Sequence, residues 1–184
     1  MNKTTRELTS SASIRRVEAV INPASGGVGP ESADELKSIL DEFGLDSRVV
    51  AAEPDRIEQA LVDAIAAKPD LLIVLAGDGT AGRAADLCGP RGPLLAPLPG
   101  GTMNMLPNAL YGPVPWRDAL IACLERGRER PVSCGEVGVH RISCAAILGA
   151  PAFWAPAREA ARKGDLRTAW RQTVFAFRRA FLPR

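Results

Sequence analysis

The chain has 184 residues, a length that suits one large domain or one and a half small ones. Hydrophobic residues make up 46% of the sequence and aromatic residues only 5%, which favours packed α/β layers over an aromatic-rich β-sandwich. The net charge of +2 gives no indication of a nucleic-acid partner.

Cysteine usage and hydropathy indicate the cellular setting. The four cysteines are scattered without a close-spaced pair, which argues against a zinc site or a disulfide scaffold and favours a reducing cytoplasm. No stretch approaches the ~20 apolar residues that a membrane span requires. We therefore expect a cytoplasmic protein.

Hydrophobic periodicity predicts alternating strands and helices over much of the chain. Residues 1–13 are rich in Ser and Thr without periodicity, which predicts a disordered tail. The apolar spacing then predicts strands at 16–21, 47–51, 71–75 and 94–98, and helices at 31–43, 55–67, 81–88 and 116–126. This alternation is typical of a parallel sheet with helices on both faces, where ligands bind beyond the carboxyl ends of the strands.

A glycine-rich turn follows the apolar strand at 71–75. Gly77 and Gly79 bracket Asp78, and Thr80 is expected to open a helix. Glycine allows a ligand to approach the backbone closely, and a helix N-terminus presents free N–H groups and a partial positive charge, so the turn predicts a phosphate site. A carboxylate would repel a bare phosphate. We therefore expect Asp78 to meet a metal ion on the phosphate, a ribose hydroxyl or the hydroxyl that is phosphorylated.

Two similar turns follow the predicted strands at 16–21 and 94–98. They contain Asn22, Pro23, Ser25, Gly26 and Gly27, and Gly100, Gly101, Thr102 and Asn104, respectively. Gly100, Gly101 and Thr102 are expected to open another helix. Each turn also has an ordinary structural explanation, because Asp, Asn-Pro and Ser-Gly are common in turns and Thr is a good helix N-cap. Three such turns in one chain favour a nucleotide site.

The pattern changes after residue 130. Short alternating segments at 132–137 and 141–148, around a turn at Gly138, predict the start of an antiparallel β unit, and 157–181 reads as one long helix. An apolar stripe on this helix has arginines beside it. The stripe favours packing against a β-domain over a peripheral contact with an anionic membrane, and it also admits self-association into a homo-oligomer.

The three glycine turns resemble the diacylglycerol kinase catalytic-domain family, which includes bacterial lipid kinases and the sphingosine and ceramide kinases. The family's marks are Asn-Pro-x-Ser-Gly, Gly-Gly-Asp-Gly-Thr and Pro-x-Gly-Thr-x-Asn-Asp. The chain carries, in the same order, Asn22-Pro23-Ala24-Ser25-Gly26, Ala76-Gly77-Asp78-Gly79-Thr80 and Pro99-Gly100-Gly101-Thr102-Met103-Asn104. The resemblance implies a nucleotide-binding α/β domain at 14–130, of the type shared with NAD kinases. It also implies that 131–184 is the incomplete start of a β-rich lipid-binding domain.

The resemblance further implies an ATP-dependent lipid kinase. Such an enzyme uses ATP and Mg²⁺ to phosphorylate a lipid hydroxyl, with a diacylglycerol-like acceptor. We expect it in the cytoplasm, where a peripheral contact with the inner membrane surface is an option. In the family, the residue that matches Asp78 lies near the terminal phosphates and Mg²⁺. It is the proposed base in the sphingosine kinases, whereas the bacterial lipid kinases place the base in the second domain.

The sequence departs from the family pattern at three positions. Ala76 replaces the first glycine of the central motif, Gly82-Arg83 replaces Asn-Glu, and Met105 replaces the final Asp of the third motif. Two carboxylates are therefore missing. A NAD kinase-like enzyme shares the central turn, but the Asn-Pro-x-Ser-Gly loop favours the lipid branch. Arg83 and Met105 support a further alternative, a nucleotide-binding module with weak or no catalysis.

Overall fold

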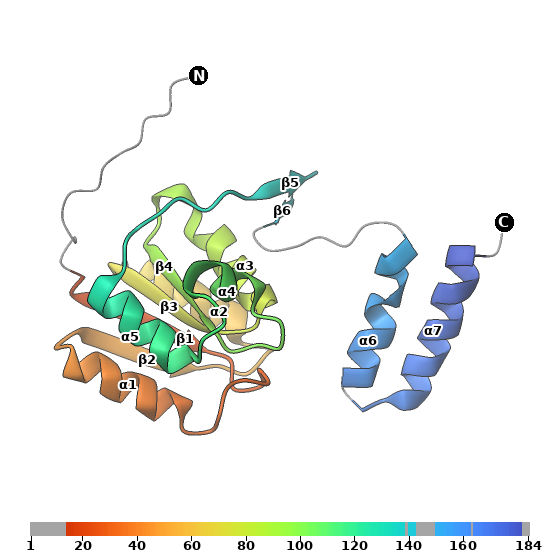
Figure 1. Cartoon of the computed structure of the whole chain (residues 1–184), viewed down its shortest axis with the longest axis horizontal. Helices are drawn as coiled ribbons and strands as arrows, with labels where there is room; N and C mark the ends of the chain where they lie inside the picture. The colour runs from red at the N-terminus through yellow and green to blue at the C-terminus, as the bar shows by residue number, and fades with distance from the viewer. Residues whose placement is uncertain (1–13, 139, 143–149, 163, 182–184) are drawn as a thin grey trace, which may run out of the picture. The chain divides into compact units, whose positions relative to one another are not determined.

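The computed structural model describes residues 14–138, 140–142, 150–162 and 164–181 (Figure 1). The predicted tail at 1–13 and much of the predicted strand at 141–148 lie outside the described residues. The chain divides into two compact units, residues 1–144 and 145–184, and each unit is described by itself.

The first unit contains a four-stranded parallel sheet. Its strands are β1 (Arg16–Ile21), β2 (Asp46–Ala51), β3 (Leu71–Ala76) and β4 (Leu94–Pro99), and their order is β2-β1-β3-β4. All three pairings are parallel, so the carboxyl ends of the strands share one edge of the sheet. The prediction of a parallel α/β sheet is confirmed, and each strand boundary lies within one residue of the predicted one.

Helices cover both faces of this sheet (Figure 1). Leu36 and Leu40 of α1 (Ser32–Glu42) and Leu120 of α5 (Trp116–Arg126) join one buried apolar cluster. Leu61 of α2 (Ile57–Ala66) and Ala84 of α3 (Asp78–Cys88) join the other. The strands of parallel sheets are buried on both faces, so β3 can be wholly apolar, and all six of its residues are buried.

Asp70, just before β3, ties the starts of three strands together. Its carboxylate accepts hydrogen bonds from the backbone N–H groups of Arg15 and Arg16, each at 2.9 Å. Its backbone N–H donates to Arg16 O, and its carbonyl accepts from Leu94 N. The two N–H donors stabilise the ionised carboxylate and hold the pKa of Asp70 below its ordinary value of 3.8.

We expect Asp70→Asn to make the stability of the protein less sensitive to acid. A carboxylate whose pKa is lowered by folding stabilises the folded state above its unfolded pKa, and this contribution disappears as the pH falls through the folded pKa. Asp70→Asn should therefore lower the melting temperature at pH 7, and the difference from the wild type should close below pH 3.8. Asp55→Asn, at another exposed position, is the control. A difference in melting temperature that persists in acid would show that the ionised carboxylate of Asp70 does not stabilise the fold.

A small antiparallel pair follows the four-stranded sheet and its helices. Strands β5 (Gly135–Val137) and β6 (His140–Ile142) pair around Gly138, whose φ is +61°. The predicted antiparallel turn is confirmed, although β5 begins three residues later than predicted. Both strands are short, and a two-stranded hairpin of this kind is only marginally stable by itself.

The second unit corrects the prediction of one long helix at 157–181. It contains a 3₁₀ turn η2 (Ala150–Trp154) and two helices, α6 (Ala155–Arg162) and α7 (Leu166–Phe181). Gly164 has a φ of +78°, and Asp165 Oδ1 accepts a hydrogen bond from Thr168 N at 2.9 Å. A glycine with positive φ ends a helix, and an aspartate directly before the next helix caps the new one. The apolar periodicity continued through these two residues and hid the break.

Within the part of the chain that the structure describes, no helix is both long and apolar enough to cross a membrane.

Candidate active site

The three glycine turns meet at the carboxyl edge of the sheet because they follow β1, β3 and β4. Gly27 N donates to Gly100 O at 2.9 Å, which joins the first turn to the third. Asn22 N donates to Leu75 O at 3.0 Å, and Gly100 N donates to Ala76 O at 3.1 Å. The structure therefore brings the three predicted motifs into direct backbone contact.

The first turn is shaped by its own backbone and by Asn22. Asn22 Oδ1 accepts from Ala24 N at 3.0 Å, and Asn22 O accepts from Ser25 N at 3.0 Å. Ser25 O in turn accepts from Val28 N at 3.0 Å. Asn22 thus forms the turn, as an asparagine at a strand exit commonly does. Gly26 and Gly27 are exposed, as is Pro23.

The second turn leads directly into α3. Gly77 is extended, with φ −78° and ψ 168°, and its carbonyl accepts from Ala81 N at 3.1 Å. The helix therefore begins at Asp78, two residues before the predicted start at Thr80. Asp78, Gly79 and Thr80 form its first turn, whose N–H groups have no partner within the helix and point towards its N-terminus. This geometry suits an anion at the carboxyl edge of the sheet.

The third turn is held by Asn104. This residue has a φ of +51°, a left-handed conformation that asparagine tolerates better than most residues. Its Oδ1 accepts from Gly101 N at 2.7 Å, and its Nδ2 donates to Gly101 O at 3.0 Å. The helix α4 (Met105–Tyr111) begins after Asn104. The prediction that Gly100, Gly101 and Thr102 open this helix is wrong, and exposed Thr102 is not its N-cap.

Asp78 connects the second turn to α4, the helix that follows the third turn. Its Oδ1 accepts a hydrogen bond from Leu106 N, in the first turn of α4, at 3.1 Å. A carboxylate at this place satisfies one of the unpaired N–H groups of α4 and lies at the positive end of the helix dipole. The sequence pattern indicates Asp78 but not this contact, because 28 residues separate the two partners.

Close packing explains why two of the glycines are required. A Cβ on Gly101 would lie 2.6 Å from Gly77 Cα, and a Cβ on Gly100 would lie 2.8 Å from Ala76 N. Both neighbours are backbone atoms that cannot rotate away. A Cβ on Gly79, in contrast, would meet no described protein atom within 4 Å. Gly79 therefore leaves open space on the first turn of α3.

The two predicted departures that remove a carboxylate, Arg83 and Met105, differ in their surroundings. Arg83 Nε lies 3.2 Å from Glu58 Oε1, so its guanidinium pairs with α2. This pair lowers the pKa of Glu58 below its ordinary value. Met105 is the first residue of α4 and is 41% exposed. Arg83 thus has a structural partner outside the three turns, whereas Met105 leaves a thioether where the family has a carboxylate.

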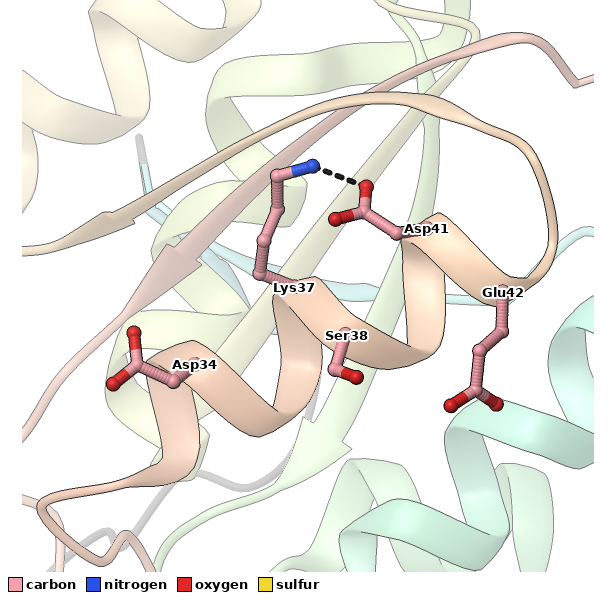
Figure 2. A pocket seen from close by; sticks show the side chains of 5 residues that line it. All are labelled: Asp34, Lys37, Ser38, Asp41 and Glu42. Atoms are coloured by element: carbon pink, nitrogen blue, oxygen red, sulfur yellow. Dashed lines mark hydrogen bonds and ion pairs between the residues drawn. The ribbon is translucent and has the colours of Figure 1, made fainter.

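One surface hollow belongs to α1 and to none of the three turns. It has a volume of about 530 Å³ and is lined by five residues of α1, namely Asp34, Lys37, Ser38, Asp41 and Glu42 (Figure 2). Lys37 and Asp41 form an ion pair one helical turn apart. A hollow lined only by side chains of one exposed helix is a gap between those side chains and does not indicate a ligand site.

A smaller hollow, about 330 Å³, lies beside the first turn. It is lined by Gly27, Gly29, Pro30, Glu31, Ser32, Glu35, Trp116 and Arg117. Arg117 forms an ion pair with Glu35, and its guanidinium carbon lies 4.6 Å from the centre of the Trp116 ring. Sequence analysis did not select Trp116 or Arg117. Their only signal was an aromatic–basic pair at the start of a helix, a pattern too common to indicate a site.

Metal-ligating and nucleophilic side chains do not cluster at this edge. No group of three or more His, Cys, Asp or Glu side chains within the described ranges could hold a metal ion. Cys88, Cys123 and Cys134 are free thiols. Burial raises the pKa of Cys88 to about 11, so that thiol is a poor nucleophile. Asp78 is the one carboxylate in the three turns.

Comparisons with known proteins agree with this architecture. The model of the family described as diacylglycerol kinase catalytic domain matches residues 16–137. Three solved structures from Bacillus anthracis str. Sterne, all described as diacylglycerol kinases and two only as candidates, are similar. Their identities are 24%, 23% and 23%, and their TM-scores are 0.50, 0.53 and 0.51. At these identities the likeness shows the fold.

The structural matches cover only part of this chain and part of each solved chain. They cover 62%, 61% and 63% of this chain, and 43%, 42% and 41% of the solved chains. The matched region thus spans less than half of each solved chain. A search of curated proteins finds no match.

Proposed function

Because the chain belongs to the diacylglycerol kinase catalytic-domain family, we propose that it supplies the ATP-binding part of a lipid kinase. In this proposal, residues 14–130 bind the nucleotide and residues 131–184 begin the part that binds the lipid. The substrate is a lipid hydroxyl of the diacylglycerol type, and the products are ADP and a lipid phosphate.

The convergence of the three turns supports this proposal most strongly. The contact from Gly27 N to Gly100 O at 2.9 Å places the first and third turns together, and Asp78 joins the second turn to α4. Phosphates would bind backbone N–H groups at this edge. The proposed nucleotide contacts are Asn22, Pro23, Ser25, Gly26, Gly27, Gly77, Asp78, Gly79, Thr80, Gly100, Gly101, Thr102 and Asn104.

The donor set at this edge suits Mg²⁺ that arrives on the nucleotide. Mg²⁺ in such sites keeps several waters and is bound by the phosphates with one or two protein carboxylates. Asp78 supplies one carboxylate, and Leu106 N fixes its position. When bound, Mg²⁺ neutralises charge on the phosphates. No dedicated protein cage is needed for this binding mode, which agrees with a single acidic residue in the three turns.

In the proposed reaction, the lipid hydroxyl oxygen bonds to the γ-phosphorus and the bond to the β–γ bridging oxygen breaks. ADP leaves, and the hydroxyl proton passes to a base. Catalysis of this kind depends mainly on positioning and on stabilising negative charge. Asp78 is the candidate base within the described residues, and the turns hold the phosphates in place.

ATP is expected to raise the melting temperature of the chain. A ligand that binds only the folded state at a hundredfold above its dissociation constant adds about 2.7 kcal/mol to the free energy of unfolding. The measurements are thermal denaturation and titration calorimetry with millimolar Mg·ATP. The absence of both a melting shift and binding heat would contradict the nucleotide site.

Two alternatives give different results in the same experiments. A NAD kinase-like enzyme would phosphorylate NAD, so NAD is tested as acceptor beside diacylglycerol. A nucleotide-binding module would show the melting shift without transfer to either acceptor. Met105, where the family has a carboxylate, favours this second alternative. Met105→Asp tests it, because a restored carboxylate should then raise transfer.

A further inference from the structure

One face of α7 exposes a continuous apolar stripe. Its members recur at intervals of four, four, three and four residues, which places them on one side of a helix. They are Leu166, Trp170, Val174, Phe177 and Phe181, with exposed fractions of 74%, 72%, 36%, 56% and 64%. These side chains are large and apolar, and most of them are more than half exposed.

This stripe is not the surface that joins α6 to α7. The buried residues of the two helices are alanines, Ala157 and Ala160 on α6 and Ala176 on α7. Ala176 follows Val174 by two residues and therefore points away from the stripe. Phe181 contacts Trp154 of η2, with ring centres 6.2 Å apart, and Phe177, at 5.0 Å. The stripe therefore remains exposed after α6 and α7 have packed against each other.

Charge along the stripe has one sign. The ionisable residues of α7 are four arginines, Arg167, Arg171, Arg178 and Arg179, and all four are exposed. Arg167, Arg171 and Arg178 each follow a stripe residue by one position and so form a row along one edge of it. The helix contains no acidic residue to neutralise them.

We propose that this face of α7 docks onto the surface of an anionic phospholipid bilayer. The 16 residues form a helix about 24 Å long, and it would lie in the plane of the membrane. The aromatic and aliphatic stripe enters the boundary between headgroups and acyl chains, and the arginine row pairs with lipid phosphates. Charge complementarity selects this occupant, because α7 presents four arginines and no acidic residue beside its apolar stripe, which matches an anionic surface.

This inference does not depend on the kinase proposal, since it needs neither ATP nor the glycine turns. The test is cosedimentation of the 184-residue chain with vesicles of phosphatidylcholine alone and of equal parts phosphatidylcholine and phosphatidylglycerol, in about 0.1 M salt. We expect partitioning onto the anionic vesicles to be at least tenfold stronger than onto the neutral ones. Lipids with brominated acyl chains should quench the tryptophan fluorescence of the wild type more than that of the Trp170→Phe variant.

Two double variants separate the stripe from the charge. Trp170→Gln with Phe177→Gln removes apolar surface, and Arg171→Glu with Arg178→Glu reverses two charges. Each should weaken binding at least tenfold. Arg91→Glu with Arg126→Glu makes the same charge change at exposed positions of the first unit and should change binding less than twofold. Circular dichroism checks that each variant keeps the helix content of the wild type.

Three outcomes would overturn the proposal. Equal binding to both kinds of vesicle would remove the role of charge. Equal losses in the first-unit control would assign the binding to overall charge. A dimer in sedimentation equilibrium that the stripe variant dissociates, with no preference for anionic vesicles, would assign the face to a second copy of the chain.

Discussion

Replacing Asp78 with Asn is expected to slow phosphoryl transfer by a factor of about 10²–10⁴, the usual contribution of a general base. The amide keeps the shape of the side chain and an oxygen that can still accept from Leu106 N. It loses the charge that would polarise the acceptor hydroxyl or hold Mg²⁺. The assay is transfer of radiolabelled phosphate from ATP to diacylglycerol in mixed micelles.

A second readout for this variant does not require lipid turnover. Mg²⁺ should strengthen ATP binding by the wild type and have little effect on ATP binding by Asp78→Asn. Asp78→Ala is the companion variant, because it also removes the acceptor for Leu106 N, and loss of such a helix-terminal acceptor costs about 0.5–2 kcal/mol of stability. If Asp78→Asn matched the wild type in transfer and in Mg²⁺ dependence, Asp78 would only anchor α4.

Gly101→Ala is expected to destabilise the fold and abolish the ATP-induced melting shift. The added Cβ would lie 2.6 Å from Gly77 Cα, so the second and third turns must separate. Forcing a methyl group into a packed site typically costs about 1–3 kcal/mol. Urea denaturation measures the loss, and thermal denaturation with Mg·ATP measures the missing shift.

Two glycines of α3 provide matched controls. A Cβ at Gly79 or Gly82 meets no described atom within 4 Å, so alanine should fit at either position. Alanine in a helix is more favourable than glycine by about 0.5–1 kcal/mol, so Gly82→Ala should stabilise the protein and leave ATP binding unchanged. Gly79→Ala should also fold well, yet weaken ATP binding if phosphates approach the first turn of α3. If Gly101→Ala matched the wild type in stability and in the melting shift with Mg·ATP, the close packing of the turns would be contradicted.

The sheet and its ends could be predicted because their signals are local. Continuous apolar runs such as Leu71–Ala76 require burial on both faces, and glycines just after them mark where the chain must turn. Element boundaries were less accurate. The start of α3 at Asp78 rather than Thr80, and of α4 at Met105, depends on backbone caps that side-chain periodicity does not report.

The break at Gly164 and Asp165 shows the limit of periodicity from the other direction. The apolar spacing runs on across both residues, yet glycine with positive φ and a capping aspartate divide the helix. The two residues carried the correct local signal. Because α6 and α7 pack against each other through alanines, the apolar stripe of α7 stays exposed. The prediction of one long helix had placed this stripe against a β-domain.

In the first unit, the sequence alone determined the alternation of strands and helices, the three turns and the place of Asp78 in the central turn, because each depends on residues next to one another in the chain. Tertiary structure alone decided which groups touch. The bond from Gly27 N to Gly100 O, the bond from Leu106 N to Asp78 and the pairing of Arg83 with Glu58 all join separate segments. They exist because parallel crossovers bring the carboxyl ends of β1, β3 and β4 to one edge, a juxtaposition that no local pattern encodes.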